Sequence, residues 1–120
     1  MRSILVENYQ IHIGDDSLSQ INFLDYSQIA ILVDENTKRD CLPVFLSHNK
    51  IHDNFVIIEI PSGEANKNIF SCNIIWTQLI DNKFDRDSLL INLGGGVIGD
   101  MGGYCASTYI RGIAFMHIPT

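Results

Sequence analysis

The segment from Gly94 to Asp100 has the residue types and spacing of a phosphate-binding turn. Its glycines at positions 94, 96 and 99 satisfy the pattern G-x-G-x-x-G, between an apolar run and a stretch of helical character. Glycine lets the backbone approach a phosphate closely, and a helix N-terminus offers unpaired N–H groups and a partial positive charge. The pattern therefore predicts a ligand that contains a pyrophosphate. Alternatively the glycines serve only a sharp turn and close helix–strand packing, because the pattern is weak evidence by itself.

The acid that usually accompanies this pattern is not at its usual place. In dinucleotide-binding folds the glycine turn follows the first strand, and an acid about 20 residues later contacts the ribose. Here the turn follows the fourth expected core strand, and the corresponding window holds Arg111 and neutral residues. Asp34, at the end of the apolar run 29–33, is the candidate for a ribose contact, because strand ends line the ligand crevice. It could equally cap the helix that follows.

Asp100 and the glycine pair 102–103 lie inside the expected helix after the turn. The helix dipole stabilises a carboxylate in the first turn, and Asp100 could instead hydrogen-bond to a substrate hydroxyl or a ribose. Two glycines inside a helix lower its stability, so they indicate a close contact with the neighbouring strand or with a ligand.

The histidines and cysteines do not have the spacing of a metal site. The three cysteines lie about thirty residues apart without a C-x-x-C pair, and their odd number excludes a fully paired disulfide framework. His12 and His117 are expected in strands and His48 and His52 in loops, and none is assigned to a metal. Reduced cysteines favour a cytoplasmic protein.

Apolar runs that alternate with amphipathic stretches must position these residues. Strands are expected at 3–7 and 9–13, as an antiparallel pair, and at 29–33, 55–60, 88–93 and 113–118. Helices are expected at 38–47 (shortened or kinked by Pro43), 66–83 and 97–109, with a short one through Leu18, Ile21 and Leu24 capped by Asp15 or Asp16. The alternation predicts an α/β, Rossmann-like fold with a mostly parallel sheet flanked by helices.

Composition narrows the class of protein further. The chain has 120 residues, 46% of them hydrophobic, and a formal charge of −6, which indicates one globular domain. The acidic balance argues against nucleic acid or an anionic membrane surface as the main partner. No apolar run reaches the roughly 18 residues of a membrane span. The last expected strand is followed only by Pro119 and Thr120, so we expect a truncated domain.

Three blocks of this sequence resemble the 3-dehydroquinate synthase family, in the right order along the chain. They are ILVDEN at 31–36, PSGEANK at 61–67, and the glycine block 94–113 followed by IPT at 118–120. The resemblance implies that residues 1–120 are the N-terminal NAD-binding domain, incomplete relative to the full family fold. Gly102 departs from the family pattern, in which a bulkier residue often precedes a single glycine.

The resemblance also implies an activity. Members of the family convert DAHP, a seven-carbon keto-sugar acid phosphate, into 3-dehydroquinate with loss of phosphate, in the shikimate pathway to aromatic amino acids. NAD is regenerated in each turnover, and a divalent metal, usually zinc, is bound by the C-terminal helical domain, which is absent here. The implied protein is a cytoplasmic enzyme, a homodimer when complete, without a nucleic acid or membrane partner.

By the same resemblance, Asp34 and Asn36 lie near the adenosine of NAD, and Glu64 and Lys67, next to Gly63, hold its ribose. Without the resemblance, Glu64 and Lys67 would read as the first turn of a solvated helix. Arg111 would bind the anionic substrate, or else neutralise the C-terminus of the preceding helix. The remaining implied cofactor contacts are Gly95, Gly96, Val97, Ile98, Gly99, Asp100 and Thr120, of which Asp100 is also the one candidate for a catalytic role.

Other functions stay open at this level. They are a related sugar-phosphate cyclase of the 2-deoxy-scyllo-inosose synthase type, an oxidoreductase of the glycerol dehydrogenase type, and a nucleotide-binding module without catalysis. The 120 residues by themselves are expected to be inactive.

Overall fold

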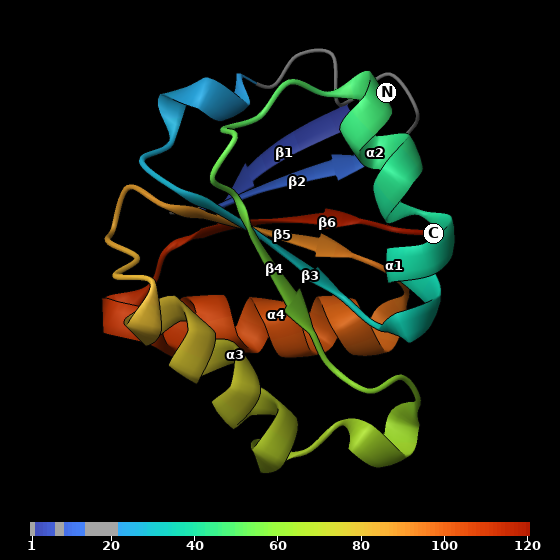
Figure 1. Ribbon diagram of the computed structural model, residues 1–120. Coiled ribbons are helices and arrows are strands. Elements are labelled where there is room, and N and C mark those ends of the chain that lie inside the picture. The colour runs from blue at the N-terminus through green and yellow to red at the C-terminus, as the bar shows by residue number, and fades with distance from the viewer. Residues whose placement is uncertain (1, 7–8, 14–21) are drawn as a thin grey trace.

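The computed structural model describes residues 2–6, 9–13 and 22–120 (Figure 1). Its strands are β1 (Arg2–Val6), β2 (Tyr9–Ile13), β3 (Ile29–Val33), β4 (Val56–Glu59), β5 (Leu89–Leu93) and β6 (Ala114–Ile118). Its α-helices are α1 (Glu35–Asp40), α2 (Leu42–His48), α3 (Ile69–Asp81) and α4 (Gly96–Thr108). Short 3-10 helices are η2 (Phe23–Asp25), η3 (Glu64–Asn66) and η4 (Tyr109–Arg111).

Four strands form a parallel sheet in the order β4-β3-β5-β6. In the central pair Ile31 of β3 lies opposite Ile91 of β5. The other two strands, β1 and β2, pair antiparallel, and β2 lies beside β6 (Figure 1). The predicted α/β class, with a parallel sheet and an N-terminal antiparallel pair, is confirmed.

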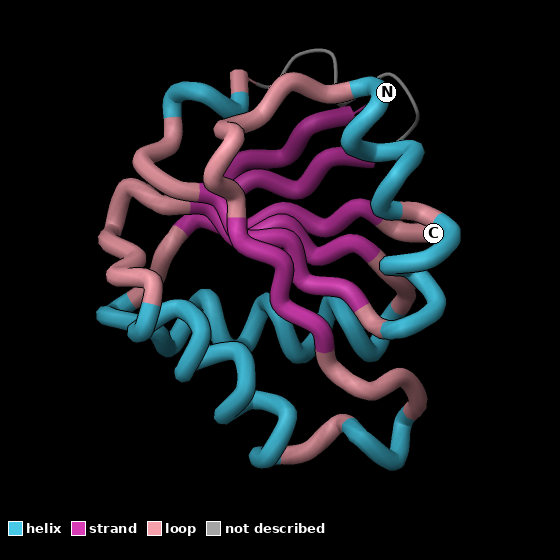
Figure 2. Tube along the Cα trace, in the orientation of Figure 1, coloured by secondary structure: helices cyan, strands magenta, loops and turns pink. Residues whose placement is uncertain are grey.

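Helices cover both faces of the parallel sheet, as Figure 2 shows. Successive strand side chains point to opposite faces. Ile31 and Val33 accordingly pack with Leu42 and Phe45 of α2, whereas Leu32 packs with the residues of α3 and α4. All five residues of β3 and all five of β5 are buried, which is why both strands are continuous apolar runs apart from Asn92.

The helix expected at 38–47 is two helices that meet at Cys41. The first begins earlier than expected, at Glu35, and Pro43 lies in the first turn of the second. A proline there loses no hydrogen bond, because N–H groups of the first turn have no partner within the helix. His48 is the last residue of α2 and not a loop residue, which corrects that expectation.

The other expected helices are present with small shifts at their ends. Of the short helix expected around residue 20, Leu18, Ile21 and the capping aspartates lie outside the described residues, and Leu24 lies in η2. None of the helices in the described part is long and apolar enough to cross a membrane. The three cysteines are free thiols.

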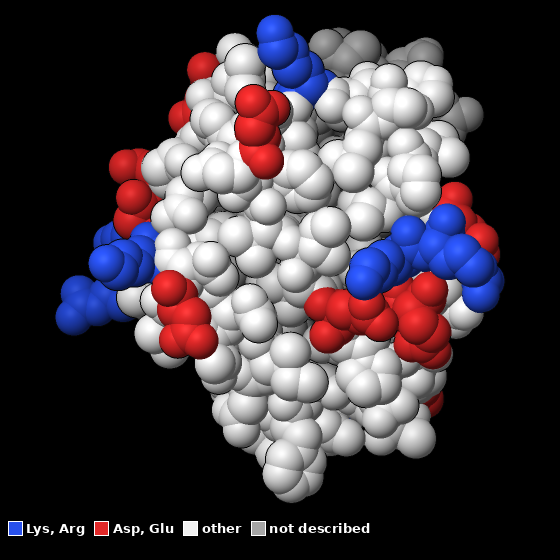
Figure 3. Space-filling view, in the orientation of Figure 1, with Lys and Arg blue, Asp and Glu red and all other residues white. Residues whose placement is uncertain are grey.

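Charged side chains of opposite sign lie together on the face drawn in Figure 3. Lys38 pairs with Glu59 at 3.0 Å, and Arg39 pairs with Asp40 at 2.8 Å. These basic residues therefore do not form the isolated positive surface that favours a polyanion.

Candidate functional site

The candidate site lies at the carboxyl ends of β3 and β5, two adjacent strands from which the chain leaves toward opposite faces of the sheet. From β3 the chain continues into α1 on one face, and from the adjacent β5 it continues into α4 on the other face (Figure 1). Ligands of open α/β sheets bind outside the carboxyl ends of such a strand pair. Asp34 follows β3 and Gly94 follows β5, so the topology brings the two predicted motifs to one edge.

The glycine turn contains one glycine that packing requires and two open positions. A Cβ at Gly94 would lie 2.7 Å from Cγ1 of Ile98, so this glycine is needed for close packing of the turn. At Gly95 and Gly96 a Cβ would meet nothing within 4 Å. The space above these two residues is therefore open to a ligand that approaches the backbone.

The N-terminus of α4 is left without a side-chain cap. Gly95 is its N-cap and carries no side chain, so the N-cap position supplies no acceptor for the N–H groups of the first turn. These groups include the N–H of Gly96, Val97 and Ile98, and they come with the positive end of a 13-residue helix. An anion fits this arrangement, which has the residues that a pyrophosphate requires.

Asp34 caps α1. Its Oδ1 accepts hydrogen bonds from the N–H groups of Asn36 and Thr37, both at 2.9 Å, and Thr37 Oγ1 accepts from the Asp34 N–H at 3.0 Å. This reciprocal arrangement is a capping box. The helix-cap interpretation is therefore confirmed, and a ribose or adenosine contact of Asp34 and Asn36 stays a prediction.

Glu35 joins the loops that follow β3 and β4, which sequence reasoning missed. Its carboxylate accepts from the Ser62 N–H at 2.9 Å and from the Ser62 hydroxyl. These hydrogen bonds hold the pKa of Glu35 below its usual value. The next residue, Gly63, has φ +98°, a backbone conformation that favours glycine, and η3 with Glu64 begins directly after it.

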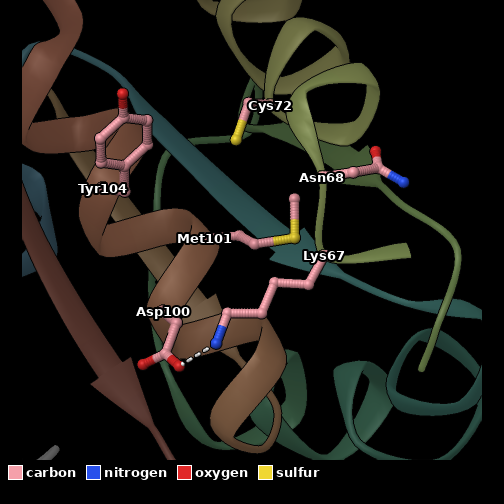
Figure 4. Close-up of a pocket in the computed structure, with 6 residues that line it drawn as sticks. All are labelled: Lys67, Asn68, Cys72, Asp100, Met101 and Tyr104. Atoms are coloured by element: carbon pink, nitrogen blue, oxygen red, sulfur yellow. Dashed lines mark hydrogen bonds and ion pairs between the residues drawn. The ribbon is translucent and has the colours of Figure 1, made fainter. Parts of the chain in front are cut away.

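Lys67 links the second motif to the glycine block. Its Nζ lies 2.8 Å from Oδ2 of Asp100 and 3.7 Å from Oε1 of Glu64 (Figure 4). The hydrogen bond and charge of each partner lower the pKa of Asp100 and raise that of Lys67. The sequence indicated a Glu64–Lys67 pair, but the shorter contact in the structure is with Asp100, 33 residues further along the chain.

A small cavity of about 150 Å³ adjoins this ion pair, between the start of α3 and the first half of α4. The ion pair lies along one side of it, and Asn68, Cys72, Met101 and Tyr104 line the rest (Figure 4). The space is enough for a small ring or a few polar groups, not for a whole dinucleotide.

Two predicted site residues lie at opposite edges of the sheet. Thr120 follows β6 at the carboxyl edge and is exposed. Arg111 lies in η4, after the end of α4, and so at the other end of this helix from the glycine turn. A 13-residue helix is about 20 Å long, so within this chain Arg111 does not join the other site residues.

Comparison with known proteins identifies the family. The family model of the 3-dehydroquinate synthase N-terminal domain matches residues 57–120. The chain belongs to the 3-dehydroquinate synthase family. The resemblance read from the three motif blocks is thus confirmed.

Curated relatives of similar sequence are 3-dehydroquinate synthases. The chain is 36% identical over 117 residues to the 3-dehydroquinate synthase of Nitrosospira multiformis, covering 93% of this chain and 32% of that protein. It is 40% identical over 122 residues to that of Blochmanniella floridana, covering 94% and 33%. The chain therefore spans about a third of the length of these relatives.

Solved structures share the fold. One is ValA, the 2-epi-5-epi-valiolone synthase from Streptomyces hygroscopicus subsp. jinggangensis with NAD+ and Zn2+ bound. It matches with a TM-score of 0.73 and 20% identity, and the match covers 99% of this chain and 34% of that chain. Another is 2-deoxy-scyllo-inosose synthase with carbaglucose-6-phosphate, NAD+ and Co2+, with a TM-score of 0.71, 22% identity, and coverage of 93% and 32%.

Proposed function

We propose that this chain is the NAD-binding part of a cytoplasmic enzyme that converts DAHP into 3-dehydroquinate with loss of phosphate, in the shikimate pathway. The observation that carries the proposal is the uncapped N-terminus of α4, at the carboxyl edge of the sheet, with open space above Gly95 and Gly96. Membership of the family supports the same conclusion.

The residues divide the work of binding NAD. The N–H groups of Gly96, Val97 and Ile98 donate to the pyrophosphate, while the missing side chains at Gly95 and Gly96 leave room for it. The Glu64 carboxylate accepts from ribose hydroxyls, and Lys67 balances its charge. Asp34, Asn36 and Gly63 line the adenosine side, and Asp100 and Thr120 face the nicotinamide side. Bound NAD supplies the oxidation of a substrate alcohol and a later re-reduction.

The substrate assignment rests on the relatives of similar sequence, which are 3-dehydroquinate synthases at 36% and 40% identity. They support DAHP as the substrate. Arg111 would then bind the anionic substrate in the complete enzyme, which we propose is a homodimer with a divalent metal, such as zinc, bound outside residues 1–120.

A valine at Gly95 tests the cofactor site. Gly95 has φ −82° and nothing lies near the position of its Cβ, so Gly95→Val leaves the fold intact but fills the space of the pyrophosphate. We expect NAD affinity, measured by isothermal titration, to fall at least about tenfold, with only a small decrease in melting temperature because valine is a poorer N-cap than glycine. Lys38→Ala, a change at an exposed ion pair, is the control and should bind NAD normally. Equal binding by Gly95→Val and the unmodified chain would contradict the proposal.

A further inference from the structure

A polar pair lies between α4 and the sheet, close to the proposed cofactor site. Asn92 of β5 is 1% exposed, and its Nδ2 lies 3.2 Å from Nδ1 of half-buried His117 on β6. The imidazole packs against the glycine face of α4: a Cβ at Gly99 would lie 3.2 Å from Nδ1, and one at Gly103 would lie 3.6 Å from Cε1. The His117 ring therefore contacts α4 at Gly99, the residue before Asp100.

The hydrogen bond sets the state of the imidazole. With the Asn92 amide oriented so that its NH₂ faces the ring, that NH₂ donates, Nδ1 accepts, and the neutral ring carries its proton on Nε2. Burial lowers the pKa of His117, and the nearby carboxylate of Asp100 offsets part of this. Within residues 22–120 that carboxylate, itself paired with Lys67, is the charged group that acts on the ring. His117 is accordingly neutral at pH 7.

We propose that His117 is a positioning residue of the cofactor site: fixed by Asn92 as a neutral ring, it holds the first turns of α4 in the position that binds the dinucleotide. The inference rests on the proposed function. The Gly99 N–H closes the first turn of α4 onto the Gly95 carbonyl at 3.0 Å, so a displacement of Gly99 moves the pyrophosphate-binding backbone. Loss of the ring's support is thereby transmitted directly to the site.

The role has a pH dependence of definite sign. Protonation places a hydrogen on Nδ1, which then faces the amide hydrogens of Asn92, so this hydrogen bond breaks and the ring or the Asn92 amide must reorient. NAD affinity should therefore decrease as pH falls through the pKa of His117. Simple electrostatics predicts the opposite, because a positive charge below a pyrophosphate would strengthen binding at low pH. Whether NAD affinity falls or rises at low pH therefore distinguishes a positioning role of His117 from simple charge attraction.

Two substitutions of His117 test the proposal, with NAD affinity measured between pH 5 and 8. His117→Gln keeps a hydrogen-bond acceptor without a titratable group, so it should retain affinity and lose the pH dependence. His117→Leu fills similar space without an acceptor, so affinity should fall about tenfold at every pH. Melting temperatures report whether each variant folds. If the leucine variant fails to fold, the pH dependence of NAD affinity in the glutamine variant and in the unmodified chain still tests the proposal.

A second measurement does not depend on NAD. Nitrogen-15 chemical shifts of the imidazole should identify the Nε2-protonated neutral form. A proton on Nδ1 at pH 7, affinity that rises as pH falls, or normal binding by a folded His117→Leu variant would overturn the inference. If the unmodified chain does not bind NAD, both this inference and the proposed function are wrong; binding that is insensitive to His117 overturns the inference alone.

Discussion

Asn92 of β5 and Gly102 of α4 face each other, and the Asn92 side chain fills the space that a side chain at position 102 would need. A Cβ at Gly102 would lie 1.8 Å from Oδ1 of Asn92 and 2.3 Å from its Cγ, far inside the closest separation of real atoms. The same Oδ1 has no hydrogen-bond partner among the described residues. The helix glycine that departs from the family pattern is therefore explained by the neighbouring strand, one of the two contacts that the sequence left open.

Gly102→Ala should destabilise the fold by about 1–3 kcal/mol, because Asn92 is buried in a central strand and cannot move aside. In an Asn92→Ala background the alanine should instead be tolerated, because alanine favours a helix over glycine by about 1 kcal/mol. Denaturant unfolding of the single and double variants measures this coupling.

The matched control for that cycle is Gly96→Ala, in the same helix, where a Cβ would meet nothing within 4 Å. It should leave stability unchanged or slightly increased. Additive effects of Asn92→Ala and Gly102→Ala would contradict the steric account.

At the scale of elements, the Lys67–Asp100 ion pair connects the segment just before α3 to the N-terminal half of α4. Removing the ammonium with Lys67→Met should raise the pKa of Asp100 toward its ordinary value, because the hydrogen bond and charge of Lys67 are the largest causes of its lowering. Carbon-13 titration of the carboxyl group measures the change. Lys38→Met is the matched control, since Lys38 pairs with Glu59 and should leave Asp100 unaffected.

The same pair should add little to stability. The Asp100 side chain is 64% exposed and that of Lys67 38%, and exposed ion pairs contribute little. Because the pKa of Asp100 is lower in the folded state, any contribution is complete above the ordinary pKa and is lost as pH falls through the lowered one. A large difference in melting temperature between Lys67→Met and the unmodified chain at pH 7 would contradict this view.

Sequence patterns predicted the elements because their causes are local. Buried parallel strands need continuous apolar runs, so 29–33 and 89–93 were identifiable, and the glycine turn was identifiable from its spacing. The contacts of Glu35 with Ser62, Lys67 with Asp100 and Asn92 with His117 join residues 25 to 33 positions apart, and only the strand order brings them together. No local pattern marks such pairs, and His117 read as an ordinary strand residue.

At the scale of the whole molecule, we expect residues 1–120 to bind NAD without catalysing the reaction. The proposed NAD contacts lie within these 120 residues, but among the residues described no three His, Cys, Asp or Glu side chains gather as a metal site would require. The relatives are about three times as long, and a solved relative of the fold holds Zn2+ together with NAD+. We therefore expect the 120-residue chain to bind NAD yet release no phosphate from DAHP, even with NAD and Zn2+ added.

A phosphate-release assay checks that expectation, with the full-length synthase of Nitrosospira multiformis, 36% identical over the shared part, as the positive control. The reason is chemical: the helix N-terminus and the ion pair of this chain are the groups that we propose bind and orient NAD. Alcohol oxidation followed by elimination also needs groups that bind the substrate's hydroxyls, and Arg111 lies a helix length from the glycine turn. Phosphate release above the background of DAHP with NAD alone would mean that residues 1–120 already contain a complete catalytic site.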